Sequence, residues 1–155
     1  MKSSLRKELR TVAEAVIHAC RNIAENREYS SETLTAEIKT GCLTMGQQFE
    51  IEDYLRKLDE EIGENDFFVD EFYGVCKGGY STYRAHYTKA VVPSPLVYSC
   101  DFADGFIYFE VTFEIVTTQH TELGSITLSS DSFQETLSCF NVLSEEEYED
   151  YDDDY

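Results

Sequence analysis

The stretch that decides the fold is FIYFEVTFEIVTT, residues 106–118. Its residues alternate between an apolar set and a set that is mostly polar or charged. The apolar set is Ile107, Phe109, Val111, Phe113 and Ile115, and the other set is Tyr108, Glu110, Thr112, Glu114 and Val116. Strict alternation of β-branched and aromatic residues is typical of a long β-strand with one buried face. We therefore expect a sheet whose apolar face is covered by other elements of the chain.

Amphipathic segments near the N-terminus are the candidates for this cover. In residues 4–25 apolar side chains recur every three or four positions, as they do along one face of a helix. Residues 49–62 show the same periodicity. A shorter helix is predicted for residues 31–40, closed by Gly41. We therefore expect the helices of this chain within residues 4–62.

After these helices the pattern changes to that of strands. The predicted strands are residues 67–75, 80–92, 96–102, 106–118 and 124–129. Asp104-Gly105 is a signal for a tight hairpin into the long strand. Short connections between consecutive strands favour antiparallel pairing. A short helix is expected at residues 132–140, where Ser132 and Glu135 fit a capping box.

Together these elements predict the fold class. We expect an α+β fold in which N-terminal amphipathic helices pack on an antiparallel sheet of about five strands, followed by a short C-terminal helix and an acidic tail. Residues 1–143 are predicted to form a single domain, with its sheet in residues 67–129, and residues 144–155 to form the tail. A chain of 155 residues can bury about 70% of its unfolded surface without disulfides or metals.

The net charge is unusual in both size and placement. The chain has 31 acidic residues against 12 Lys and Arg, which gives a net charge of −19. Residues 90–155 hold 15 of these acids and contain no Lys or Arg. Such an excess argues against direct binding to nucleic acid or to an anionic membrane, and favours a basic protein partner. A surface that serves solubility alone usually mixes both signs.

The N-terminal segment lacks the apolar core of a signal peptide, and no segment has the length of a membrane span. The five cysteines are odd in number and contain no CxxC pair. Reduced thiols in a cytosol are the simplest interpretation of this pattern. We therefore expect a cytoplasmic protein.

No catalytic signature stands out in the sequence. Residues 86–88 (HYT) fit the HxT element of the two-histidine phosphoesterases, but residues 120–122 (HTE) lack the hydroxyl of a second element. A small hydrolase that uses His86 and His120 is one alternative, and it requires both imidazoles within about 4–7 Å of a shared site. The sequence shows no metal-ligand spacing. We expect a protein that is not an enzyme and that has no cofactor and no metal.

The tail, SEEEYEDYDDDY, has eight acids in the ten positions 145–154. Their spacing is about 4 Å per charge in an extended chain and about 2 Å in a helix, whereas duplex DNA carries one charge per ~1.7 Å of axis. In composition the tail resembles the DNA-mimic antirestriction and anti-CRISPR proteins of phages and mobile elements. This resemblance of charge pattern implies an inhibitor that presents carboxylates to a basic nucleic-acid-binding or defence protein.

The helix predicted for residues 49–62 ends in acids, which is the unfavourable sign for a helix dipole and suggests another use for them. The predicted partner-binding residues are Glu145, Glu146, Glu147, Tyr148, Glu149, Asp150, Tyr151, Asp152, Asp153, Asp154, Asp59, Glu60, Glu61 and Glu64. The other alternative is an immunity protein that neutralises a basic toxin. A mimic competes with nucleic acid for its target, whereas an immunity protein bound beside the active site need not compete.

Overall fold

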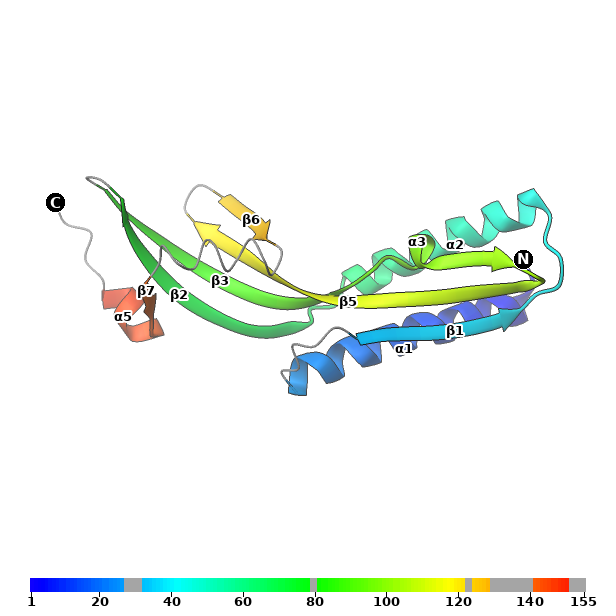
Figure 1. Cartoon of the computed structure of the whole chain (residues 1–155), viewed down its shortest axis with the longest axis horizontal. Helices are drawn as coiled ribbons and strands as arrows, with labels where there is room; N and C mark the ends of the chain where they lie inside the picture. Colours follow the sequence, from blue (N-terminus) through cyan, green and yellow to red (C-terminus); the bar gives the residue numbers. More distant parts are fainter. Residues whose placement is uncertain (27–31, 79–80, 122–123, 129–140, 151–155) are drawn as a thin grey trace. The chain divides into compact units, whose positions relative to one another are not determined.

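The computed structural model describes residues 1–26, 32–78, 81–121, 124–128 and 141–150. In chain order the elements are α1 (Ser3–Asn26), β1 (Glu32–Lys39), α2 (Met45–Gly63), β2 (Phe68–Gly78), β3 (Ser81–Pro93), α3 (Leu96–Ser99), β4 (Cys100–Ala103), β5 (Phe106–Thr121), β6 (Gly124–Leu128), β7 (Asn141–Leu143) and α5 (Glu145–Asp150) (Figure 1). The predicted α+β class is confirmed. The helix predicted at residues 132–140 lies outside the described residues.

The strands pair in the order β1-β5-β3-β2-β7, and both β4 and β6 also pair with β5. The pairs with a described register are antiparallel, as predicted. The chain divides into two compact units: unit 1 is Met1–Phe67 with Val92–Glu114, and unit 2 is Phe68–Val91 with Ile115–Tyr155. The long strand β5 contributes its first part to unit 1 and its second part to unit 2.

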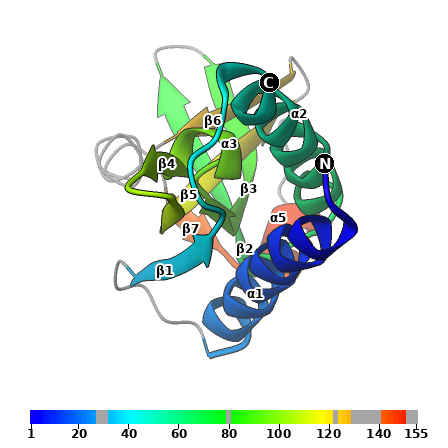
Figure 2. The ribbon, with the colours of Figure 1, turned by 90° about the vertical axis from the view of Figure 1, so that its right-hand side faces the viewer.

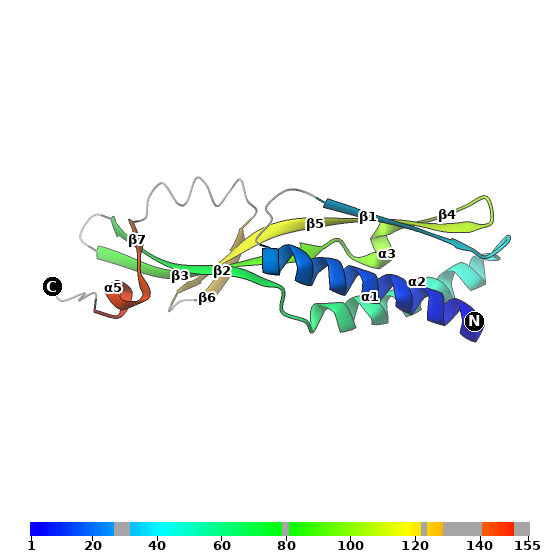
Figure 3. The same cartoon turned by 90° about the horizontal axis from the view of Figure 1, so that it is seen from below.

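Unit 1 consists of two layers. Strands β1, β4 and the first part of β5 form one layer, and helices α1 and α2 lie together on one face of it (Figures 2 and 3). The two helices run parallel, because β1 returns the chain between them. Two ion pairs link the helices, one between the amine of Met1 and Glu50 (3.2 Å) and one between Arg10 and Glu61 (3.0 Å). Arg10 and Glu61 are solvent-exposed, so their ion pair contributes little to stability.

Apolar side chains fill the space between these layers. Four of the five residues predicted for the apolar face of β5 are buried, namely Ile107, Phe109, Val111 and Phe113, whereas the fifth, Ile115, is only partly buried. The buried residues of the helices are Leu9, Val12, Ala13, Val16, Cys20 and Ile23 in α1, and Ile51, Leu55, Leu58 and Ile62 in α2. Full burial of one such aliphatic or aromatic side chain stabilises the folded state by about 1.5–3 kcal/mol. Burial of these apolar side chains is therefore the main interaction that stabilises unit 1.

The helix predicted for residues 31–40 is wrong, because this segment forms strand β1. Thr33, Thr35 and Glu37 are exposed whereas Ile38 is buried, which is the period of two residues that a strand produces. Strand β1 pairs along its whole length with β5. The segment is short, so pairing with a partner far along the chain decides its conformation.

The strand predicted for residues 96–102 is partly wrong. Leu96–Ser99 forms the short helix α3 directly after Pro95, and strand β4 begins at Cys100. The predicted hairpin between β4 and β5 is confirmed. Asp104 and Gly105 have φ values of 54° and 78°, and positive φ at both central residues is the requirement of a type I′ turn.

Unit 2 is built around the β2–β3 hairpin, to which β7 adds on the β2 side. The ring of Tyr87, which is fully buried, stacks on Phe72 with their centroids 4.8 Å apart. Strand β6 forms a hairpin with the second part of β5. None of the helices in the described ranges is both long enough and apolar enough to cross a bilayer.

Candidate protein-interaction face

The open face of the unit 1 sheet, turned away from α1 and α2, is polar. On β1 the alternate residues Thr33, Thr35, Glu37 and Lys39 are exposed. On β5 the residues between the buried ones include Tyr108, which is partly exposed, and the exposed Glu110, Thr112 and Glu114. One face of this layer therefore packs into the core, and the other face exposes its side chains to solvent.

Three strands align their side chains in a row across this face. Glu37 lies opposite Tyr108 in the β1–β5 pair, and Tyr108 lies opposite Asp101 in the β4–β5 pair. The N–H of Thr40 donates to the carbonyl of Gly105 at 2.9 Å. In an antiparallel ladder, hydrogen-bonded and non-hydrogen-bonded residue pairs alternate. Thr40 bonds to Gly105, so Glu37–Tyr108, three pairs further along the ladder, is a non-hydrogen-bonded pair. The backbone N–H and C=O of Tyr108 therefore point to β4. The two acids therefore flank Tyr108 at Cα separations of about 4.5 Å and about 5.5 Å.

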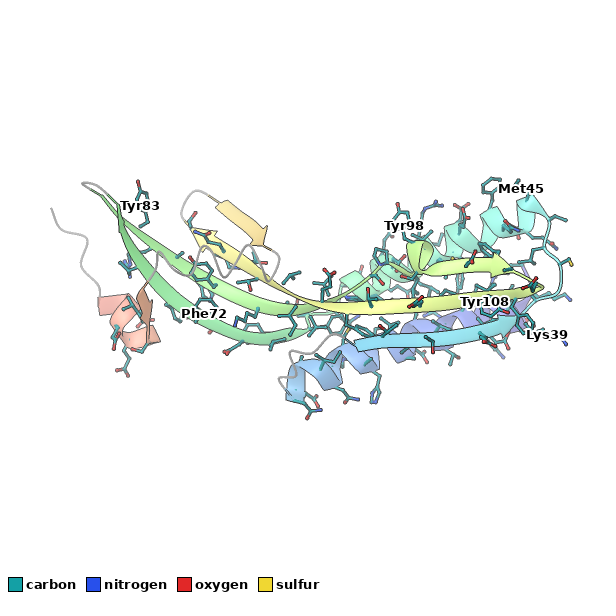
Figure 4. All side chains as sticks on the ribbon, in the orientation of Figure 1. Lys39, Met45, Phe72, Tyr83, Tyr98 and Tyr108 are labelled. Atoms are coloured by element: carbon teal, nitrogen blue, oxygen red, sulfur yellow. The ribbon has the colours of Figure 1, made fainter. Side chains whose placement is uncertain are left out.

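A third carboxylate and a second tyrosine complete the group. Glu110 follows Tyr108 by two residues, a distance of about 6.8 Å along a strand. Tyr98 of α3 is 82% exposed, and it lines the same shallow hollow as the other four residues. Tyr98 and Tyr108 lie on α3 and β5, respectively (Figure 4). We call Glu37, Tyr98, Asp101, Tyr108 and Glu110 the acidic–tyrosine face.

The carboxylates of this face are not engaged in ion pairs among the described residues, although Lys39 lies two residues from Glu37 on the same side of β1. Glu37, Asp101 and Glu110 form no ion pair with any residue in the described part of the chain. On α2, by contrast, Glu61 pairs with Arg10, and Asp53 pairs with Arg56 at 2.9 Å. The face therefore offers carboxylate and phenol oxygens that can accept hydrogen bonds from the Lys and Arg side chains of a cationic partner.

The four acids predicted on α2 have different surroundings. Asp59 accepts hydrogen bonds from the backbone N–H groups of Leu96 (2.7 Å) and Val97 (3.1 Å), and so caps the first turn of α3. Burial raises the pKa of Asp59, and these two hydrogen bonds oppose the shift. The side chains of Glu60 and Glu64 are exposed. Both oxygens of Asp59 are therefore engaged inside unit 1, which gives this residue a structural role that the sequence did not indicate.

The acidic tail is described as far as Asp150. Residues 145–150 form helix α5, and the N–H of Glu147 donates to the hydroxyl of Ser144 at 3.2 Å. Glu146, Glu147 and Glu149 are exposed. The remaining predicted residues, 151–154, lie outside the described residues. The acids at the start of α5 are favourable for its dipole, whereas Glu149 and Asp150 in its last turn are unfavourable.

The structure brings the two histidines of the hydrolase alternative together. The ring centroids of His86 on β3 and His120 on β5 are 5.5 Å apart. His86 Nε2 lies 3.0 Å from Glu71 Oε2, and because a carboxylate accepts, the imidazole is the donor. The ring of His86 also stacks on the ring of Tyr73 at a centroid distance of 4.7 Å. Within the described ranges no three His, Cys, Asp or Glu side chains are placed to hold a metal ion.

The acidic–tyrosine face is the feature that sequence reasoning missed. Asp101 and Glu110 contribute to the acidic bias of residues 90–155, but nothing in their positions relates them to Glu37. One available signal was the alternation in residues 32–39, which would have identified a strand and its polar side. The pairing of that strand with β5 has no local signal, since it depends on contacts between distant segments.

No family model matches this sequence, and no match was found among curated proteins or among solved structures. The class of protein is therefore defined by the fold and the face alone: an α+β protein with an acidic, tyrosine-bearing sheet surface.

Proposed function

We propose that this protein is a cytoplasmic, non-enzymatic inhibitor that binds a basic nucleic-acid-binding protein, such as a defence protein, by imitating nucleic acid. The observation that carries the proposal is the acidic–tyrosine face, in which three carboxylates without a described cationic partner surround Tyr108. A groove that binds nucleic acid provides Lys and Arg for phosphates and accepts aromatic rings by stacking. Carboxylates and phenols held on a sheet supply both types of contact.

The net charge of the chain supports the same interpretation. Long-range attraction follows from the net charge of −19, which speeds encounter with a basic protein and makes binding sensitive to salt. The acids of α5 and α2 add to this field.

The test compares two triple variants of equal charge. The first carries Glu37→Gln, Asp101→Asn and Glu110→Gln. The matched control carries Glu14→Gln, Glu25→Gln and Asp66→Asn, which are exposed acids of unit 1 outside the face. Both variants lose three negative charges, so a general effect of net charge is the same in each.

Each variant and the wild type are immobilised and exposed at low salt to lysate of the host cell. A truncated protein that ends at Leu143 tests the tail. We expect the wild type and the matched control to capture a nucleic-acid-binding protein that duplex DNA or RNA displaces, and the face variant to lose it. Equal capture by both triple variants would refute a role of the face. Capture that nucleic acid does not displace would favour the immunity alternative.

A second candidate function rests on one observation, the 5.5 Å separation of the His86 and His120 rings. Two rings at this separation can both contact one small substrate group, and the side chain of His86 is 31% exposed. Glu71 holds one ring by a hydrogen bond, as an orienting carboxylate does in many acid–base pairs.

Hydrolysis of bis(p-nitrophenyl) phosphate tests this candidate. Activity that is lost in both His86→Ala and His120→Ala, but kept in His18→Ala, would support it. His18 is an exposed histidine of α1 and is the matched control. An inactive wild type, or activity unchanged in the His86 and His120 variants, would refute it.

A further inference from the structure

Strand β1 lies at the end of the strand order and, among the described residues, pairs with β5 alone. We infer that β1 receives an extended, basic segment of the partner as an additional strand of the sheet. The inference rests on the proposed function, since it takes the basic partner from there and adds how that partner binds. Addition of a peptide to an open sheet edge is a common mode of recognition, in which backbone hydrogen bonds give affinity and alternate side chains give specificity.

The register of β1 identifies the backbone groups that face its outer edge. Thr40 donates to the carbonyl of Gly105, so the even-numbered residues of this segment bond to β5. By the alternation of an antiparallel ladder, the N–H and C=O groups of the odd-numbered residues point away from β5. These residues are Thr33, Thr35, Glu37 and Lys39. They form a row of donors and acceptors that an incoming strand can pair with.

The same four residues direct their side chains to the open face, where all of them are exposed. An added strand would therefore place every second side chain beside Thr35 and Glu37, in line with the row that continues through Tyr108 to Asp101. Lys or Arg at those positions would meet the negative charge of the acidic–tyrosine face. The intervening side chains would lie beside Leu34 and Ala36, which are partly exposed on the helix side of β1. The edge thus fits a segment that alternates basic and small apolar residues.

Charge also selects between possible occupants of the edge. A second copy of this chain would bring another net charge of −19 to the same place, and like charges oppose such an association. A basic segment gains from the same field. The chemistry of the edge therefore favours a cationic partner over self-association.

The test uses the synthetic peptide KVKVKVK and a peptide of equal charge, KPKPKPK, whose prolines cannot donate to a ladder. Binding is measured by fluorescence anisotropy at low salt, with the wild type, Thr35→Pro and the matched control Thr35→Val. Proline at position 35 removes an outward N–H and leaves the bonds of β1 to β5 in place. Valine keeps that N–H and the branched shape. Thermal unfolding of each variant checks that it folds.

We expect the dissociation constant of KVKVKVK to rise at least about tenfold in Thr35→Pro and to stay unchanged in Thr35→Val. KPKPKPK should bind the wild type more weakly than KVKVKVK. A measurement on the wild type alone is independent of any folding defect: hydrogen exchange of the Thr33, Thr35 and Glu37 amides should slow when KVKVKVK binds. A chain that dimerises through β1 would instead show this protection without peptide, which would overturn the inference.

The outcomes separate this inference from the proposed function. If both peptides bind the wild type and Thr35→Pro equally, and the three amides stay unprotected, strand addition is refuted while binding of a basic partner stands. If neither peptide binds even at low salt, both strand addition and the proposed attraction of basic partners are refuted.

Discussion

The carboxylate of Asp59 makes two contacts whose loss has a defined cost. Asp59→Ala removes the hydrogen bonds from the N–H groups of Leu96 (2.7 Å) and Val97 (3.1 Å). A hydrogen bond to a charged group contributes about 1.5–3 kcal/mol, and a helix cap about 0.5–2 kcal/mol. Because both bonds share one half-buried carboxylate whose burial carries a desolvation cost, we expect the free energy of unfolding to fall by about 1–2 kcal/mol. Asp59→Asn keeps one acceptor oxygen, and we expect a loss of about 1 kcal/mol.

The assay is urea-induced unfolding followed by circular dichroism. The matched control is Glu60→Ala, because Glu60 is the exposed neighbour of Asp59 on the same helix. An exposed substitution of this kind changes the free energy of unfolding by less than about 0.5 kcal/mol. If Asp59→Ala unfolds at the same urea concentration as Glu60→Ala, the capping role of Asp59 is refuted.

The pKa of Asp59 adds a test with a definite sign. Burial raises this pKa above its ordinary value of 3.8, so the folded state holds the proton more tightly than the unfolded state. Between 3.8 and the raised value, the free energy of unfolding therefore falls as pH rises. We expect the wild type to gain stability relative to Asp59→Asn as pH is lowered into that interval. A wild type that loses stability relative to Asp59→Asn on acidification would contradict the assignment.

Three further predictions concern unit 1. Gly105→Ala should destabilise it by about 1–2 kcal/mol, because Gly105 has φ 78° and an added Cβ would lie 3.3 Å from a backbone atom. Gly46→Ala, in a helix with open space around it, should leave stability unchanged or slightly higher in the same urea titration. Thr44→Ala should cost about 1 kcal/mol, since Thr44 forms a capping box at the start of α2, and an unchanged midpoint would exclude this. Iodoacetamide should label the exposed Cys42 in the folded protein. It should label Cys20 only after urea is added, because Cys20 is buried and burial raises its pKa to about 12. Equal labelling of the two cysteines without urea, measured by mass spectrometry, would contradict this.

The sequence by itself determined the elements whose signal is local. The alternation in residues 106–118 predicted the buried face of β5, and the periodicity of residues 4–25 predicted α1. The Asp104-Gly105 pair predicted the tight hairpin between β4 and β5, and the φ values of the two residues assign it to type I′. In each case the deciding residues lie within a few positions of one another, because side-chain periodicity and turn geometry depend on near neighbours.

Only the tertiary structure decided the features that join distant segments. Residues 32–39 became a strand because β5 offered an edge to pair with, against the helix predicted from the sequence. Asp59 became a cap because α2 and α3 pack together. The row of Glu37, Tyr108 and Asp101 exists because three strands adopt one register. Strand order and register depend on which distant segments bury their apolar side chains against one another, and a local sequence pattern does not specify those partners.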